Sequence, residues 1–267
     1  MSSSAILRLL RPHATPINGA DRDDALLARF RHSRDEQAFG IIVQRYGRLV
    51  WSVCRQMLQH KTDAEDAYQA TFLALIRSSH TIRGPLAPWL HRVAYRVSIK
   101  LRQRLIKQSQ RDKLQARREA TVPVPDSAWD SMLATVHKEI AQLPEKLRVP
   151  LVLCCMEGQG VTEAAQSVGL KLGTFSSRLT QAKQLLLYRL TRRGLSITAA
   201  GLSIITISQA SAISPAHYQL ALQLLQRGAV SPLITSLCHG VVVMYTRMQL
   251  AAAVTVLLGA AGAAKNA

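Results

Sequence analysis

The feature that most constrains the fold is a helical spacing of apolar side chains, which persists from Asp21 to about Arg193. Apolar residues recur three or four positions apart, as at Phe39, Ile42 and Tyr46. This spacing places them on one face of an α-helix. The first 190 residues hold no alternating apolar and polar run bounded by turn signals, which would indicate a half-buried strand. The sequence therefore predicts an all-α protein.

Proline and polar stretches divide this helical pattern into parts. The predicted organisation is two small helical domains with a linker between them and an apolar helical tail after them. Pro85 and Pro88 interrupt only the first domain, ahead of a new helix at Trp89. The linker is polar and ends in Pro-Val-Pro. In chain order the parts are a loose leader at 1–20, the first domain at 21–107, the linker at 108–128, the second domain at 129–194 and the tail at 195–267.

An acidic stretch, DAEDAYQATFLAL at 63–75, stands out because the chain carries a formal net charge of +18. Thr62 or Asp63 can cap a helix here. Glu65 and Asp66 then fall in its first turn, where the helix dipole favours anions. Spacing alone leaves two interpretations open: the acids only start a helix, or they form a functional acidic face.

A basic helix with interleaved aromatics follows, WLHRVAYRVSIKLRQRLIK. Its cations suit phosphates and its flat rings suit unstacked bases, as single-stranded nucleic acid requires. The alternative is a solvated basic face with core aromatics. The whole chain has 34 Lys and Arg against 16 Asp and Glu, a balance that favours a polyanionic partner.

A helix-turn-helix pattern occupies the second domain. A short helical pattern at 162–168 is followed by a turn at Gly169 and by a longer helix after Gly173. Pro150 is expected to bend the preceding helix. In this motif the N-terminal end of the second helix enters the major groove. Thr174, Ser176, Ser177 and Arg178 fall at this end, and the candidate duplex-contacting residues are these four with Lys171 and Lys183.

The order of these motifs resembles the extracytoplasmic-function (ECF) sigma factors of bacterial RNA polymerase. The acidic stretch resembles the core-binding helix of their region two, WLHRVAYRVSIKLRQR resembles the following promoter-reading helix, and the segment from LPEKLRVP to QLLLYRL resembles region four. The resemblance covers about residues 21–193. It implies a cytoplasmic transcription initiation factor without enzymatic activity, which binds core polymerase and directs promoter recognition and DNA melting.

The resemblance also implies roles for individual residues. The acidic helix would dock on the basic clamp helices of the largest polymerase subunit through Asp63, Glu65, Asp66 and Gln69, with Phe72 packed inside. A loop at about 79–88 would hold a flipped base. The melted strand would lie along Trp89, Arg92, Tyr95, Arg96 and Lys100. An anti-sigma regulator is a further partner that the resemblance permits.

One departure from the family concerns the recognition helix. Ser176 and Gln181 stand where the family often has cations, so weaker phosphate contacts and a shifted promoter preference are expected.

The tail has a different composition. After Gly194 it contains three basic residues and no acidic one. Its uncharged runs at 195–213 and 248–264 are marginal against the roughly 20 apolar residues of a membrane span. Two interpretations stay open: a helical appendage packed on itself or on region four, and a tether to the inner membrane that leaves residues 1–194 in the cytoplasm. Helix starts are expected at Ser214-Pro215 and Ser231-Pro232.

Other functions lack a sequence signal. The chain has no HExxH, no GxSxG, no phosphate-binding glycine loop and no Cys/His cluster at zinc spacing, so no enzyme, metal or cofactor is expected. The remaining alternative is a helix-turn-helix regulator that binds DNA without polymerase. A plain regulator needs neither the acidic helix nor the basic aromatic helix, and their presence therefore favours the sigma factor.

Overall fold

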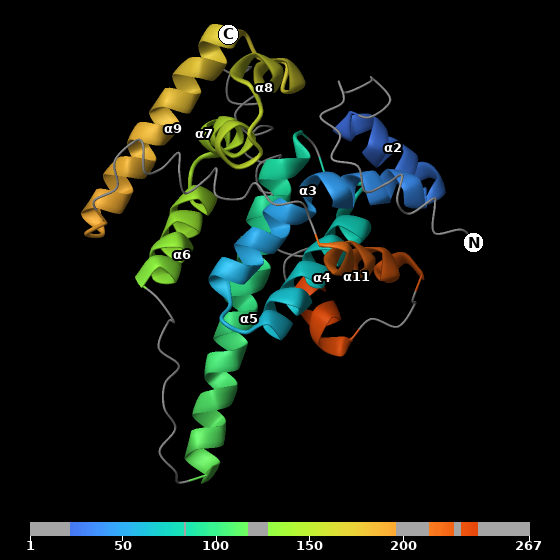
Figure 1. The fold of residues 1–267 in the computed structure, drawn as a ribbon, viewed down its shortest axis with the longest axis vertical. Helices are drawn as coiled ribbons and strands as arrows, with labels where there is room; N and C mark the ends of the chain where they lie inside the picture. The colour runs from blue at the N-terminus through green and yellow to red at the C-terminus, as the bar shows by residue number, and fades with distance from the viewer. Residues whose placement is uncertain (1–21, 83, 117–127, 196–213, 227–230, 240–267) are drawn as a thin grey trace, which may run out of the picture.

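All described secondary structure is helical, which confirms the all-α prediction (Figure 1). The predicted leader at 1–20 lies outside the described part of the chain. The computed structural model describes residues 22–82, 84–116, 128–195, 214–226 and 231–239.

Four helices form the first unit, and α3 packs against the other three. Its core holds an aromatic cluster. The ring of Phe39 lies 5.3 Å from that of Phe30 and 6.1 Å, edge on, from that of Phe72, and all three are fully buried. Such burial supplies most of the force that holds short helices together. The helices are α2 (Asp23–Ser33), α3 (Glu36–Met57), α4 (Lys61–Ser78) and α5 (Leu86–Ala116).

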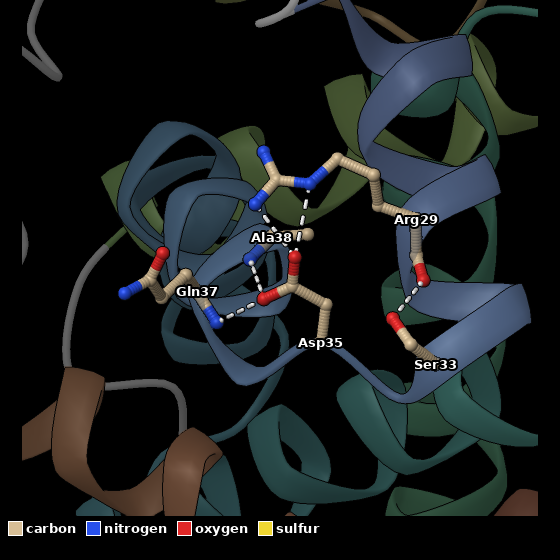
Figure 2. A network of polar contacts seen from close by, with 5 residues as sticks. All are labelled: Arg29, Ser33, Asp35, Gln37 and Ala38. Atoms are coloured by element: carbon tan, nitrogen blue, oxygen red, sulfur yellow. Dashed lines mark hydrogen bonds and ion pairs between the residues drawn. The ribbon is translucent and has the colours of Figure 1, made fainter.

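The junction between α2 and α3 is fixed by one carboxylate (Figure 2). Asp35 is the N-cap of α3: its Oδ1 accepts hydrogen bonds from the backbone N–H groups of Gln37 at 2.8 Å and Ala38 at 3.2 Å. Its Oδ2 accepts from the Arg29 guanidinium at 2.6 and 2.9 Å. The amide of Ala38 is the main cause that lowers the pKa of Asp35, and Arg29 adds to it. Asp35 thus accepts hydrogen bonds from backbone N–H groups at the start of α3 that have no partner within the helix, and it also links α2 to α3 through Arg29.

Helix α5 is longer than the sequence indicated. It begins at Leu86, ahead of the predicted start at Trp89, and continues to Ala116, beyond the predicted boundary at 107. Pro88 lies in its first turn, where a missing N–H costs no intrahelical bond. The chain therefore stays helical through the first part of the segment predicted as a linker, and residues 117–127 lie outside the described part.

The second unit carries the predicted helix-turn-helix. Pro150 removes a backbone donor near the end of α7, and the chain continues as a π-helical turn, η2, which agrees with the expected interruption. Gly169 adopts a left-handed φ of 67° between the last two helices, a conformation that glycine takes without strain. The elements are α6 (Ala128–Ala141), α7 (Glu145–Leu151), η2 (Val152–Met156), α8 (Val161–Ser167) and α9 (Leu172–Arg192).

Two helical pieces of the tail pack on the first unit. Helix α11 (Pro215–Gln226) lies against α3 and α4, and a second helix spans 232–239 (Figure 1). Both predicted helix starts are confirmed. The expectation that an appendage would pack on itself or on region four is wrong for α11, because the apolar faces of α3 and α4 receive it instead. We call α11 and residues 232–239 together the C-terminal clasp.

The membrane interpretation depends on residues that the structure does not describe, since 196–213 and 248–264 lie outside it. Within the described ranges, no helix combines the length and the hydrophobicity that a membrane crossing requires.

Candidate polymerase-binding and nucleic-acid interfaces

Helix α4 presents the predicted acidic face. The helix begins at Lys61, with His60 as an N-cap that makes no side-chain capping bond. The expected cap at Thr62 or Asp63 is therefore wrong, because the helix starts earlier and Asp63 lies in its first turn. The four predicted contact residues are all half-buried on α4: Asp63, Glu65, Asp66 and Gln69. Phe72 is fully buried, as expected.

The acids on this face repel one another. The pKa of Asp66 is raised, first by partial burial and then by the neighbouring carboxylates of Asp63 and Glu65. One cation of the same helix, Lys61, lies 3.7 Å from Glu65. A basic partner would relieve the repulsion, so the electrostatics of α4 suit a cationic protein surface.

The acidic face is partly occupied by the chain itself. The His217 ring of α11 stacks on Trp51 of α3 with ring centroids 3.8 Å apart, and its Nε2 lies 3.9 Å from Glu65 Oε1. Burial lowers the pKa of His217, although the Glu65 carboxylate opposes this. No local pattern in the sequence indicates this contact, because it joins residues far apart in the chain.

The predicted strand-binding residues of α5 do not form an open surface in this structure. Trp89 is 5% exposed and Tyr95 9% exposed, while Arg92, Arg96 and Lys100 are half-buried. The aromatic rings therefore contribute to packing, as the alternative interpretation of this helix held.

The second unit accounts for part of this burial. The pKa of Tyr95 is raised by burial and by Glu139 of α6, while Arg193 opposes the shift. These neighbours place Tyr95 beside the second unit.

The loop ahead of α5 is shorter than the predicted 79–88, because Pro88 already belongs to α5. In this loop, the Ile82 carbonyl accepts a hydrogen bond from Arg31 at 3.2 Å.

A pair of buried histidines joins the two units. His91 Nε2 of α5 lies 3.1 Å from His137 Nδ1 of α6, and the other nitrogen of His137 contacts Gln56 Oε1 of α3. Burial lowers the pKa of both rings, that of His137 to about 4, and Arg148 lowers that of His91 further. The pair is therefore neutral near pH 7. Lone histidines carry no sequence pattern, and nothing in the sequence signalled this contact.

The helix-turn-helix presents an open surface. Helix α9 begins at Leu172, just before the predicted start after Gly173. Its buried face, which includes Phe175, Leu179 and Leu186, packs on α7 and α8. Four of the predicted duplex-contacting residues are exposed: Lys171, Thr174, Ser177 and Lys183. Ser176 and Arg178 are half-buried.

The far end of α9 is held by a buried carboxylate. Glu139, 3% exposed, lies 2.7 Å from Arg193 and 3.6 Å from Arg189. This pairing fixes the angle of α9 against α6 and so orients its open N-terminal end.

Comparisons with known proteins match both units. Residues 42–107 match the family described as sigma-70 region 2, and residues 133–186 match sigma-70, region 4. The chain is 29% identical over 152 residues to the ECF RNA polymerase sigma factor SigE of Mycolicibacterium smegmatis, covering 54% of this chain and 58% of that relative. It is 26% identical over 180 residues to the RNA polymerase sigma-H factor of Pseudomonas aeruginosa, covering 61% of this chain and 91% of the relative.

Two solved structures are also similar. One is CnrH in complex with the cytosolic domain of CnrY, with 22% identity and a TM-score of 0.32 over 64% of this chain and 97% of that one. The other is the sigma factor RpoE of Bartonella quintana with the anti-sigma factor NepR, with 20% identity and a TM-score of 0.26 over 54% and 90%. This chain extends at its C-terminus beyond the part that its relatives cover.

Proposed function

The chain belongs to the ECF sigma factors of bacterial RNA polymerase, and on that premise we propose how its surfaces divide the work of initiation. The acidic face of α4 binds core polymerase, α5 holds the melted strand, and the N-terminal end of α9 reads the upstream duplex. As a sigma factor the protein directs transcription initiation and performs no covalent chemistry itself. The proposed division of the chain keeps a leader, region two, a linker, region four and the tail, with the linker after Ala116.

The observation that best supports a polymerase contact is the mutual repulsion of the acidic side chains on α4. Asp66 is the central residue of the face: burial raises its pKa most, and the carboxylates of Asp63 and Glu65 raise it further. A basic surface, which we take to be the clamp helices of the largest polymerase subunit, would stabilise all three charges. Opposite charge also speeds encounter and excludes wrong partners.

Region four supplies the duplex contact. The exposed cations Lys171 and Lys183 suit phosphates, and the hydroxyls of Thr174 and Ser177 suit phosphates or base edges at the start of α9. Phosphate contacts set position and base contacts set sequence, so the hydroxyl-rich helix end would determine the promoter preference.

Strand capture requires a rearrangement. Because Trp89 and Tyr95 are buried and His91 is bonded to region four, the strand-binding face of α5 is closed in the free protein. We expect polymerase to separate the two regions and uncover these rings. The uncovered rings could then stack on bases, while Arg92, Arg96 and Lys100 neutralise phosphates.

The direct test is run-off transcription with core polymerase from the source organism and a template pool of random promoter elements. We expect specific transcripts with the wild type. Asp66→Arg should abolish them and weaken core binding about a hundredfold, because a like charge then faces the basic surface. Asp24→Arg is the matched control, since it makes the same charge change at an exposed position of α2, and should remain active. Duplex binding by the wild type without transcripts or core binding would instead support a regulator that works without polymerase.

A further inference from the structure

The C-terminal clasp touches both surfaces that region two needs for initiation. Helix α11 lies on α3 and α4, beside the acidic face, and residues 232–239 reach the cations of α5 (Figure 1). The relatives named above do not cover this part of the chain. Its role must therefore be argued from its own contacts.

Helix α11 fits α3 at a position without a side chain. A Cβ added at Gly40 would lie 2.7 Å from the Tyr218 phenol oxygen and 4.0 Å from a methyl carbon of Leu222. Gly40 lies in the second turn of α3, where alanine would favour the helix by about 1 kcal/mol. Ala221, on the same face of α11, is fully buried. The missing side chain of Gly40 thus leaves room for the Tyr218 phenol of α11 against α3.

The side chain of His217 brings α11 into contact with the proposed polymerase-binding face. Its ring lies between Trp51 at 3.8 Å and Tyr68 at 5.7 Å, measured between ring centroids, and only 7% of the residue is exposed. Its Nε2 is 3.9 Å from Glu65, one of the four proposed polymerase contacts. A polymerase helix that approaches Glu65 would meet α11 there.

The second helix of the clasp engages the strand-binding cations. The Lys100 ammonium donates a hydrogen bond to the Ser236 carbonyl oxygen at 2.7 Å, and Arg104 donates to the Ser236 hydroxyl at 3.3 Å. Arg77 lies 4.0 Å from the Cys238 sulfur. Ile234, Leu237 and Cys238 are buried. The Ser236 oxygens thus occupy positions around Lys100 and Arg104 that a phosphate would need.

The chemistry of these contacts favours reversible docking. The tail after Gly194 has no acidic residue, so it cannot neutralise the cations of α5. In its described residues, the C-terminal clasp is held by apolar burial, the stacked ring of His217 and hydrogen bonds to neutral oxygens. Acidic or phosphate ligands make stronger, charge-assisted bonds to the same cations.

We propose that the C-terminal clasp is a built-in competitor of core polymerase, docked on region two of the free protein and displaced when polymerase binds α4. Docking lowers the fraction of the protein that is competent to bind. The apparent affinity for polymerase equals the intrinsic affinity multiplied by that fraction. This inference rests on the proposed function of α4.

The test compares two single substitutions in the full-length protein, with affinity for purified core polymerase as the readout. Ala221→Glu places a charge on the buried face of α11, and Gln219→Glu places the same charge on its exposed face. If the docked form outnumbers the open form about tenfold, Ala221→Glu should bind core polymerase about tenfold more tightly than the wild type. Gln219→Glu should bind like the wild type. Equal affinities for all three proteins would overturn the proposal.

Hydrogen exchange on the wild type supplies a readout that needs no substitution. The amides of residues 219–226 should be protected in the free protein and lose protection when core polymerase is added. Protection that persists in the polymerase complex would also overturn the proposal. Failure of every variant to bind polymerase would instead refute the proposed function, so the two failures are distinguishable.

Discussion

Region two and region four differ in how they present their functional surfaces. In region four, Lys171, Thr174, Ser177 and Lys183 are exposed around the start of α9. In region two, Trp89 and Tyr95 are buried, Lys100 is bonded to Ser236, and Glu65 lies beside His217. The proposed duplex-reading surface is thus open in the free protein, and the proposed polymerase- and strand-binding surfaces are covered.

The difference indicates an order of events. On the proposed roles, a covered region two would keep the rings and cations of α5 away from nucleic acid until polymerase is present. An open region four needs no such restraint, because duplex contacts at one small helix end are weak without polymerase.

Replacing one buried phenylalanine in each region should show most strongly that the two regions have different activities. Phe72→Ala in region two and Phe175→Ala in region four each remove a fully buried ring and should lower the free energy of unfolding by about 3–5 kcal/mol. Denaturant unfolding measures both. Phe72→Ala should abolish polymerase binding and leave duplex binding, and Phe175→Ala should do the reverse. Loss of both activities in both variants would show that the regions do not act separately.

Acid should open the contact between the regions. The pKa values of His91 and His137 are lowered in the closed form, that of His137 to about 4, against an ordinary value of 6.5. The contribution of these two neutral histidines to the closed form is therefore complete above pH 6.5 and is lost as the pH falls toward 4, by up to about 1.4 kcal/mol per pH unit for each histidine. Energy transfer between dyes on the two regions should fall over this range. His137→Gln should flatten the change.

A carboxylate at the contact between the regions, Glu157, changes the stability of the closed form with pH in the direction opposite to the histidines. Burial raises the pKa of Glu157 to about 7, with Arg45 and Arg48 opposing and Asp23 adding to the shift. Its deprotonation therefore weakens the closed form as the pH rises from about 4.5 toward 7. Glu157→Gln removes this titrating carboxylate, which favours the closed form at low pH, and should therefore make the acid-induced opening steeper. An unchanged pH profile in both variants would contradict the assignment of the contact to these groups.

Single lysines should show the open and covered surfaces directly. Lys171→Ala should weaken duplex binding by the free protein and reduce the slope of log affinity against log salt by about one. Lys100→Ala should leave single-strand binding by the free protein almost unchanged, because Lys100 is already bonded to Ser236. In the polymerase complex, the same substitution should weaken capture of the melted strand. A large effect of Lys100→Ala in the free protein would show that region two is open.

The smallest effect is expected at the cap of α3. Asp35→Ala removes the acceptor for Gln37 and Ala38 and should lower the free energy of unfolding of region two by about 1 kcal/mol. Asp35→Asn keeps a capping oxygen and should cost less. Duplex binding by region four should not change in either variant, as a filter-binding assay would show.

The sequence predicted what depends on local pattern. Helical periodicity predicted the two units, the Ser214-Pro215 signal predicted the start of α11, and Gly169 predicted the turn, because each depends on neighbouring residues. The acidic residues lie on α4, as predicted, and the proposed duplex contacts lie between the N-cap Lys171 and Lys183 in the middle of α9.

Contacts between distant segments could not be predicted in this way. His91 and His137 meet across 46 positions, and Gly40 receives Tyr218 from the tail. Gly40 was the one available signal, since an isolated glycine within a helical pattern often marks a close approach. Whether Trp89 and Tyr95 face solvent or core depends on how the two regions pack, and helical spacing within α5 does not contain that information.

The most direct test of the account measures the distance between the regions in the full-length protein. Dyes attached through non-natural amino acids at the exposed positions Gln103 of α5 and Gln184 of α9 would report it by energy transfer. We expect high transfer in the free protein, no change with duplex promoter DNA, and a drop at one equivalent of core polymerase. Transfer that stays constant while polymerase binds would contradict the claim that region two is covered until polymerase opens it.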